Sequence, residues 1–192
     1  MLTLRSGLAA SAGPPDLHIF PAGPFDAPAS PAGGVFGLVT GLLDVKSRGS
    51  VQLRSADPLD PPRIDLAHLR DPDDLERMVE ATLQARRISR TAPLSDLVQG
   101  PELAPGDSIS DADRPGLARS IRDRVSSYHH PVGTCAMGPD PEAGAVVDAR
   151  GSVHSVTGLS VADASIMPTI PSANTNVSTI LVAERIAAWL TT

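Results

Sequence analysis

The pattern of apolar and polar residues predicts strands in the first third of this chain. Residues 35–45 are a mostly apolar run, and residues 50–54 alternate apolar with polar side chains. A period of two is typical of a strand with one buried face, so these segments predict an antiparallel hairpin that turns at residues 46–49. A shorter strand is expected at residues 17–20, between loops rich in proline.

Helical periodicity begins in the middle of the chain. Asp71 followed by proline is a helix start signal, because aspartate can accept from the free first amides and proline suits the first turn. The apolar stripe that continues to Arg90 predicts a surface helix covering the sheet. Asp73 and Arg77, one turn apart, are expected to form an ion pair. A shorter helix is expected at about residues 110–125.

The sequence changes character after Tyr128. Residues 129–147 predict loops, and Leu159–Ala162 predicts a short buried strand that ends at Asp163. A final helix is expected at residues 177–190. A strand, a loop and a helix N-terminus in this order can present backbone N–H groups to an anionic ligand.

Composition and charge exclude several classes of protein. The chain has 192 residues, which is the length of one ordinary domain or of a fragment of something larger. Its 22 acidic residues outnumber its 16 basic ones, and the basic residues form no cluster. No nucleic-acid partner is therefore expected. Apolar runs fall far short of the roughly 20 residues that span a bilayer, so no membrane span is expected. The N-terminus lacks the apolar core of a signal peptide, which favours a cytoplasmic location.

His129 and His130 are the residues best suited to acid–base chemistry. They lie in a loop between Tyr128 and Pro131, and histidine titrates near neutral pH. A hydrogen-bonded structural histidine or an exposed imidazole pair would give the same pattern. Cys135, the single cysteine, excludes an internal disulfide, and a metal site built from it and both histidines would lack a fourth ligand. No metal is expected.

Two further polar positions flank the last loop. Asn174, just before the final helix, is more often a simple cap than a catalytic group. Asp163 could accept a hydrogen bond from a ribose or ribityl hydroxyl, or could equally hold its own loop through backbone bonds. Neither residue is specific when taken singly.

Several segments in a fixed order carry a more specific signature. They are Ser47–Leu53 (SRGSVQL), Ser55–Pro58 (SADP), Tyr128–Gly138 (YHHPVGTCAMG), Val146–Asp148 (VVD), Gly158–Pro168 (GLSVADASIMP) and Asn174–Asn176 (NTN). Together they resemble the C-terminal signature of the glucose-methanol-choline (GMC) family of flavin oxidoreductases. The resemblance covers nearly the whole chain from Pro15 onward.

The resemblance implies two catalytic residues. His130 takes the place of the family histidine that faces the reactive edge of the flavin, and His129 is an extra neighbour. His130 would then remove the proton of an alcohol while a hydride leaves the carbinol carbon for the flavin. Asn174 takes a position that the family fills with histidine or asparagine, and it would hydrogen-bond the substrate oxygen.

The same resemblance implies a set of contacts to FAD. Asp163 and the amide of Ala164 would face the ribityl or pyrophosphate part of the cofactor. The amide of Thr175 would face the pyrimidine edge of the flavin, and Asn176 joins these residues in the cofactor-binding set. The positive end of the final helix would stabilise the negative charge of the reduced flavin.

The chain also departs from the family, because it contains no G-x-G-x-x-G motif for the FAD pyrophosphate. The implied fold is α+β: after an N-terminal segment, residues 1–14, an antiparallel-sheet substrate domain with covering helices occupies residues 15–127. Residues 128–192 would be the C-terminal strand and helix of a Rossmann-like FAD-binding domain whose N-terminal part is missing.

Three functions follow from this sequence. The first is FAD-dependent oxidation of a small-molecule alcohol at its CH–OH group by a choline dehydrogenase-like enzyme, active only with a complementary FAD-domain chain. The second is a hydroxynitrile lyase of the same fold, which redox turnover would distinguish from the first. The third is a non-catalytic remnant or ligand-binding domain.

Overall fold

The computed structural model describes residues 1–26, 30, 33–98 and 100–191. The chain divides into two compact units, each formed by two segments. Unit 1 consists of Met1–Arg48 and Ala67–Ser126, and unit 2 consists of Gly49–Leu66 and Ser127–Thr192. The assignment of residues 15–127 and 128–192 to substrate and FAD-binding domains stays a prediction.

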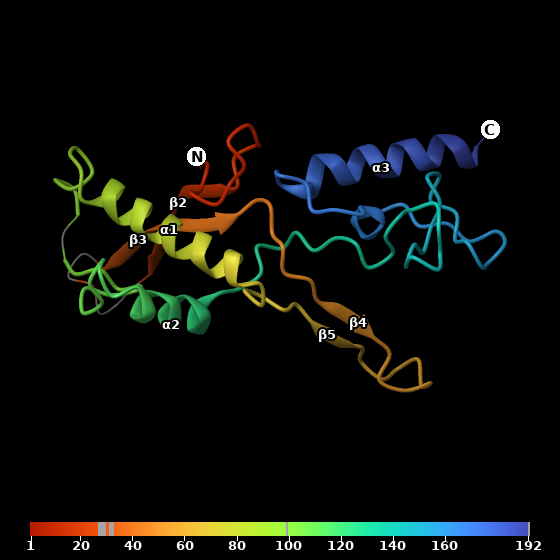
Figure 1. Ribbon diagram of the computed structural model, residues 1–192, viewed down its shortest axis with the longest axis horizontal. Helices are drawn as coiled ribbons and strands as arrows, with labels where there is room; N and C mark the ends of the chain where they lie inside the picture. Colours follow the sequence, from red (N-terminus) through yellow and green to blue (C-terminus); the bar gives the residue numbers. More distant parts are fainter. Residues whose placement is uncertain (27–29, 31–32, 99, 192) are drawn as a thin grey trace. The chain divides into compact units, whose positions relative to one another are not determined.

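Unit 1 is built on a three-stranded antiparallel sheet. The strands β1 (Leu2–Leu4), β2 (Leu17–Asp26) and β3 (Gly34–Leu42) lie in the order β1-β2-β3 (Figure 1). β2 begins where the sequence predicts a strand but continues beyond residue 20. Part of the predicted proline-rich loop, at residues 27–29 and 31–32, lies outside the described residues.

The predicted hairpin between residues 35–45 and 50–54 is wrong. β3 pairs with β2, whereas β4 (Ser50–Gln52) pairs with β5 (Arg63–Asp65) in a separate ribbon of unit 2. Residues 46 and 47 do not form the expected turn, because their backbone N–H groups donate to the carboxylate of Asp74, at 3.0 and 2.7 Å. Alternation indicates that a segment is a strand, but does not select its partner.

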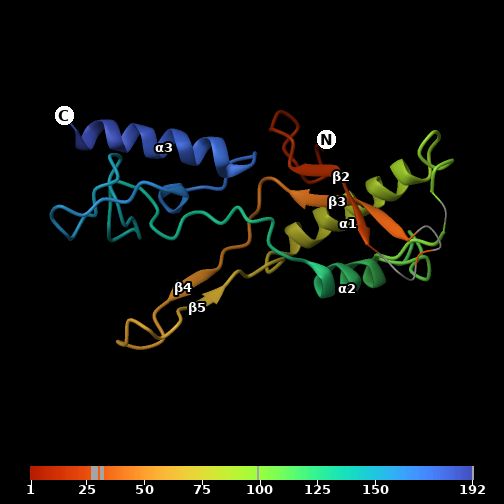
Figure 2. The same ribbon diagram turned by 180° about the vertical axis from the view of Figure 1, so that it is seen from behind.

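The helix α1 (Pro72–Ser89) covers one side of the sheet, as predicted. It packs against β3 and β2, and the view from behind also shows it beside these strands (Figure 2). The predicted cap at Asp71 is confirmed, since its carboxylate accepts from the N–H of Asp73 at 2.8 Å. The helix α2 (Arg114–Arg124) packs against α1. The buried apolar core between them contains Leu69, Val79, Leu117 and Ile121.

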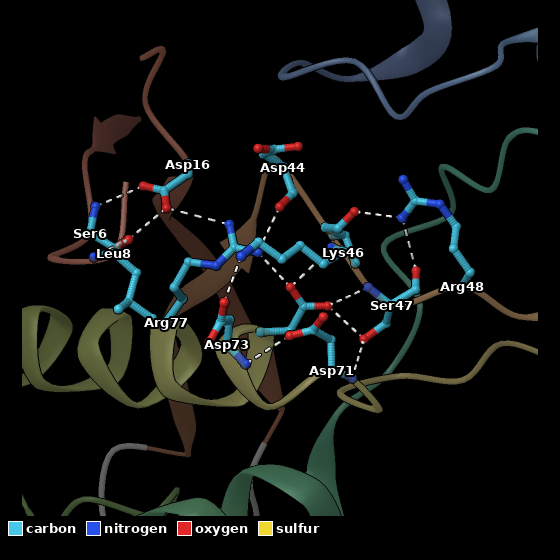
Figure 3. A network of polar contacts seen from close by, with 12 residues as sticks. Ser6, Leu8, Asp16, Asp44, Lys46, Ser47, Arg48, Asp71, Asp73 and Arg77 are labelled. Carbon is cyan, nitrogen blue, oxygen red and sulfur yellow. Dashed lines mark hydrogen bonds and ion pairs between the residues drawn. The ribbon is translucent and has the colours of Figure 1, made fainter. Parts of the chain in front are cut away.

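A polar network joins the start of α1 to the segments that precede β2 and follow β3, and its residues Asp16, Asp74 and Arg77 are buried (Figure 3). The Arg77 guanidinium donates to Asp74 at 2.5 Å, to Asp16 at 3.4 Å and to the carbonyl of Asp44 at 2.7 Å. Asp74 is fully buried and Arg77 is 3 % exposed. The predicted pair of Asp73 with Arg77 is therefore wrong, because Arg77 points inward to the buried acids and Asp73 pairs with Lys46 at 2.6 Å.

Unit 2 has little regular structure besides the β4–β5 ribbon and one long helix. Its other elements are the 3-10 helix η1 (Ala164–Ile166) and the helix α3 (Thr175–Leu190). The buried side chains of Val147, Ile166 and Ile186 form its core. In the part of the chain that the structure describes, no helix combines the length and the apolarity that a membrane crossing requires.

The predicted buried strand at Leu159–Ala162 is wrong. Within the described residues only Ser160 is paired there, in an isolated antiparallel bridge to Ser152, and Leu159 is 50 % exposed. A strand needs a neighbouring strand to bond its backbone groups, and a single bridge residue does not provide one.

Gly151 is a close-packed position in unit 2, and we expect that replacing it with alanine destabilises this unit. Its φ is +80°, and a Cβ there would lie 2.6 Å from the carbonyl oxygen of Val161 and 2.7 Å from Cδ1 of Ile186. Gly151→Ala should lower the free energy of unfolding by about 2–3 kcal/mol. Denaturant titration followed by the fluorescence of Trp189, the single tryptophan, measures this directly.

Gly158 provides the matched control for this prediction. Its φ of +77° is nearly the same, but no atom lies within 4 Å of a Cβ built there. Gly158→Ala should therefore lower the free energy of unfolding only by the cost of placing alanine in a left-handed backbone conformation, about 1–2 kcal/mol. Equal losses for the two variants would show that close packing at Gly151 contributes nothing.

Candidate functional site

The candidate site lies in unit 2, where the loop that carries His130 meets η1 and the start of α3. Two backbone hydrogen bonds connect this loop to η1: the N–H of Cys135 donates to Ser165 at 2.9 Å, and that of Met137 donates to Ile166 at 2.8 Å. The loop is therefore attached to the core of the unit and does not hang free.

The imidazole of His130 is held from two directions. Its Nδ1 lies 2.9 Å from the hydroxyl oxygen of Thr175, the first residue of α3. The ring of Tyr128 meets it edge-on, with centroids 5.1 Å apart. His130 is half-buried and Thr175 is 6 % exposed. The family resemblance implies a role only for the amide of Thr175, and no signal in the sequence identifies its hydroxyl as a partner of the histidine.

His129 has a different environment from its neighbour. Its backbone is left-handed, with φ +64°, its N–H donates to the hydroxyl of Ser127 at 3.0 Å, and the residue is exposed. The two adjacent histidines therefore have separate surroundings. The described ranges contain no cluster of three or more histidine, cysteine, aspartate or glutamate side chains placed to hold a metal ion.

Asn174 occupies the N-cap position of α3, but its side chain makes no capping hydrogen bond. The first N–H groups of a helix, here those of Thr175 and Asn176, have no acceptor within the helix. The first turn of α3 carries no acidic residue. The exposed amide of Asn174 and these N–H groups suit an electronegative ligand, such as the pyrimidine edge of a flavin.

Asp163 caps the short helix η1. Its Oδ1 accepts from the N–H of Ser165 at 2.8 Å and from the hydroxyl of Ser165 at 2.5 Å, so the carboxylate does hold its own loop. Among the described residues nothing donates to Oδ2, and Asp163 is exposed. One carboxylate oxygen therefore remains to accept from a ligand hydroxyl, and this fits the ribityl chain of FAD.

The family follows from comparison with known proteins. The family model described as GMC oxidoreductase matches residues 45–183. This chain belongs to the GMC oxidoreductase family. The predicted resemblance is thus confirmed, and the GMC relatives use FAD.

Individual GMC relatives resemble the chain over most of its length. A chloroplastic fatty acid photodecarboxylase from Chlamydomonas reinhardtii is 43 % identical over 158 residues, 80 % of this chain and 25 % of that protein. An alcohol dehydrogenase [acceptor] from Pseudomonas putida is 40 % identical over 142 residues, 74 % of this chain and 25 % of that protein.

A solved GMC structure also superposes on the chain. The crystal structure of pyridoxine 4-oxidase from Mesorbium loti matches with a TM-score of 0.74 and 34 % identity, over 92 % of this chain and 34 % of that one. The mixed α/β architecture with antiparallel sheets agrees with this neighbour. The chain spans about a quarter of the length of the curated relatives that it matches.

Proposed function

We propose that this chain is the C-terminal part of an FAD-dependent, choline dehydrogenase-like enzyme that oxidises a small-molecule alcohol at its CH–OH group. The observation that carries the proposal is the half-buried imidazole of His130, held by Thr175 beside the uncapped start of α3. This arrangement puts a proton acceptor next to hydrogen-bond donors that can hold an oxygen atom. FAD, when bound, supplies the acceptor for the hydride that leaves the alcohol carbon.

The residues of this chain have separate roles in the proposed reaction. His130 accepts the hydroxyl proton of the alcohol, which makes loss of hydride from the carbon favourable. The side-chain amide of Asn174 hydrogen-bonds the alcohol oxygen and orients the carbon. Cofactor binding falls to four residues that present amides or a carboxylate: Asp163, Ala164, Thr175 and Asn176. The positive end of the α3 dipole favours negative charge at the same place.

We further propose that residues 128–192 complete a Rossmann-like FAD-binding domain whose other part comes from a complementary chain. The support is an apolar face of α3: Val177, Ile180 and Leu181 are 78, 57 and 68 % exposed. The opposite face of α3 buries Ile186 in the core of unit 2. A helix that is apolar on both sides is typical of a buried position, so the outer face suits an apolar partner surface.

Co-expression with the N-terminal part of a GMC relative tests the proposed function. The purified pair should keep its flavin absorbance after desalting, and an alcohol added without oxygen should bleach it in the dark. A pair that retains no flavin would contradict the proposed cofactor site. If the pair retains flavin that no alcohol bleaches, and if it releases cyanide from a cyanohydrin, the protein is a hydroxynitrile lyase instead. Turnover that requires light would instead favour decarboxylation of a fatty acid, the reaction in the name of the photodecarboxylase relative.

Leu181→Asp is expected to weaken binding of the complementary chain at least tenfold, because it places a charge in the proposed apolar contact. The side chain is 68 % exposed, so the variant chain by itself should unfold at the same denaturant concentration as the wild type. Titration of labelled partner chain measures the dissociation constant. Unchanged binding by a folded Leu181→Asp variant would contradict the proposed interface.

A further inference from the structure

We infer that Thr175 is a positioning residue for His130: its hydroxyl accepts the Nδ1–H of the imidazole and leaves Nε2 as the nitrogen that takes the substrate proton. The inference rests on the proposed function, in which His130 is a base. It goes further by naming the reactive nitrogen and the group that selects it. The role is separate from the amide of Thr175, which the family resemblance assigns to the cofactor.

The contact joins a loop to a rigid element. Thr175 is the first residue of α3, and its carbonyl accepts from the hydroxyl of Thr179 one turn later, at 2.8 Å. The Nδ1 to Oγ1 distance of 2.9 Å is that of a normal hydrogen bond. Because Thr175 is 6 % exposed, little water can compete for its hydroxyl.

The ring of Tyr128 restricts the imidazole from a second direction. It lies nearly perpendicular to the His130 ring, at an interplanar angle of 80°. With Nδ1 bonded and one ring edge packed, rotation of the imidazole would break the contact with Thr175. The ring orientation is therefore set by residues of unit 2.

The tautomer follows from the chemistry of a neutral imidazole. One ring nitrogen carries a hydrogen and the other carries a lone pair, and a base needs the lone pair on the nitrogen that meets the substrate. Because Nδ1 is engaged by Thr175, only Nε2 is left for exchange with a substrate. A hydroxyl can accept from Nδ1–H in both the neutral and the protonated ring, so the contact survives proton transfer.

Three variants separate this role from general packing. Thr175→Val removes the hydroxyl but keeps the amide and the branched shape, and Thr175→Ser keeps the hydroxyl. Thr179→Val removes the hydroxyl that donates to the carbonyl of Thr175 at 2.8 Å, so it tests the anchoring of the Thr175 backbone separately from the Thr175 hydroxyl. All three variants leave the backbone N–H groups of α3 in place.

The first readout is the tautomer of His130 in the full 192-residue chain. Long-range proton–nitrogen NMR distinguishes protonated from unprotonated ring nitrogens, and loss of the signals in His130→Gln assigns them. Wild type, Thr175→Ser and Thr179→Val should show hydrogen on Nδ1, and Thr175→Val should show a mixture of tautomers. Hydrogen on Nε2 in the wild type, or an unchanged tautomer in Thr175→Val, would overturn the inference.

The second readout is flavin reduction in the co-expressed pair. Thr175→Val should slow flavin reduction about tenfold, which is the effect expected for the loss of one hydrogen bond. Thr175→Ser should restore the wild-type rate. Equal slowing in Thr175→Val and Thr179→Val would mean a packing effect and would reject the positioning role. If the pair retains no flavin, the proposed function fails, and the NMR result on the chain still decides whether Thr175 selects the tautomer.

Discussion

Replacing His130 with asparagine is expected to slow flavin reduction by the co-expressed pair by about 10²-fold or more. Asparagine can still hydrogen-bond an alcohol oxygen, but it cannot accept the proton at neutral pH. In the proposed reaction the half-buried imidazole, bonded to Thr175 through Nδ1, is the group that takes this proton. Rapid mixing with alcohol under anaerobic conditions, followed by flavin absorbance, gives the rate.

The adjacent histidine gives a control of the same chemistry. His129 is exposed and has a left-handed backbone, a conformation that asparagine tolerates well. His129→Asn should therefore leave both the fold and the rate of flavin reduction near the wild-type values. A His130→Asn enzyme that reduces flavin at the wild-type rate would remove His130 from the mechanism, and a large effect of His129→Asn would transfer the role to its neighbour.

Asp74→Asn is expected to lower the free energy of unfolding of unit 1 by about 3–5 kcal/mol. Asparagine has nearly the same volume, so no cavity forms, but the buried guanidinium of Arg77 loses the nearer of its two carboxylate partners. The carboxylate also accepts from the backbone N–H groups of Lys46 and Ser47 and from the hydroxyl of Ser47. Denaturant titration followed by circular dichroism measures the loss.

Asp73 is the matched control for Asp74, one residue earlier on the same helix. Its ion pair with Lys46 joins two half-exposed side chains, and such surface pairs contribute little. Asp73→Asn should leave the denaturation midpoint nearly unchanged. Equal destabilisation by the two substitutions would show that burial of the Asp74 carboxylate is not what matters.

The buried acids also predict how stability depends on pH. Burial by itself would raise the pKa of Asp74, but hydrogen bonds from Ser47, Lys46 and Arg77 outweigh it and hold the pKa below its ordinary value. Burial would likewise raise the pKa of Asp16, but hydrogen bonds from Ser6 and Arg77 hold this pKa below its ordinary value.

A carboxylate with a lowered pKa stabilises the fold above its unfolded pKa, near 4, and this contribution is lost as the pH falls through the folded pKa. Acid titration of the wild type should therefore show a loss of stability below about pH 4. Asp74→Asn should lose less stability over the same range, and an identical pH profile would contradict this assignment.

Local signals in the sequence were sufficient for the helices. Asp71 and the proline after it begin α1, and the last helix starts within two residues of its predicted first residue, 177. Caps and apolar stripes act within a few residues, so they can be read without knowing the rest of the fold. Pairing of strands and of buried charges joins residues far apart, and here the sequence predictions were wrong for β3, for Arg77 and for Leu159–Ala162.

The sequence by itself determined the family, because several motifs occur in a fixed order, although no single residue among them is specific. It also identified His130 and Asn174 as candidate catalytic residues. Only the tertiary structure decided what those residues touch. Thr175 lies 45 positions from His130 in the chain, and the 2.9 Å contact exists because the histidine loop and the start of α3 meet beside η1. Periodicity and motif spacing describe local geometry, whereas a hydrogen bond between distant residues depends on packing that the whole unit determines.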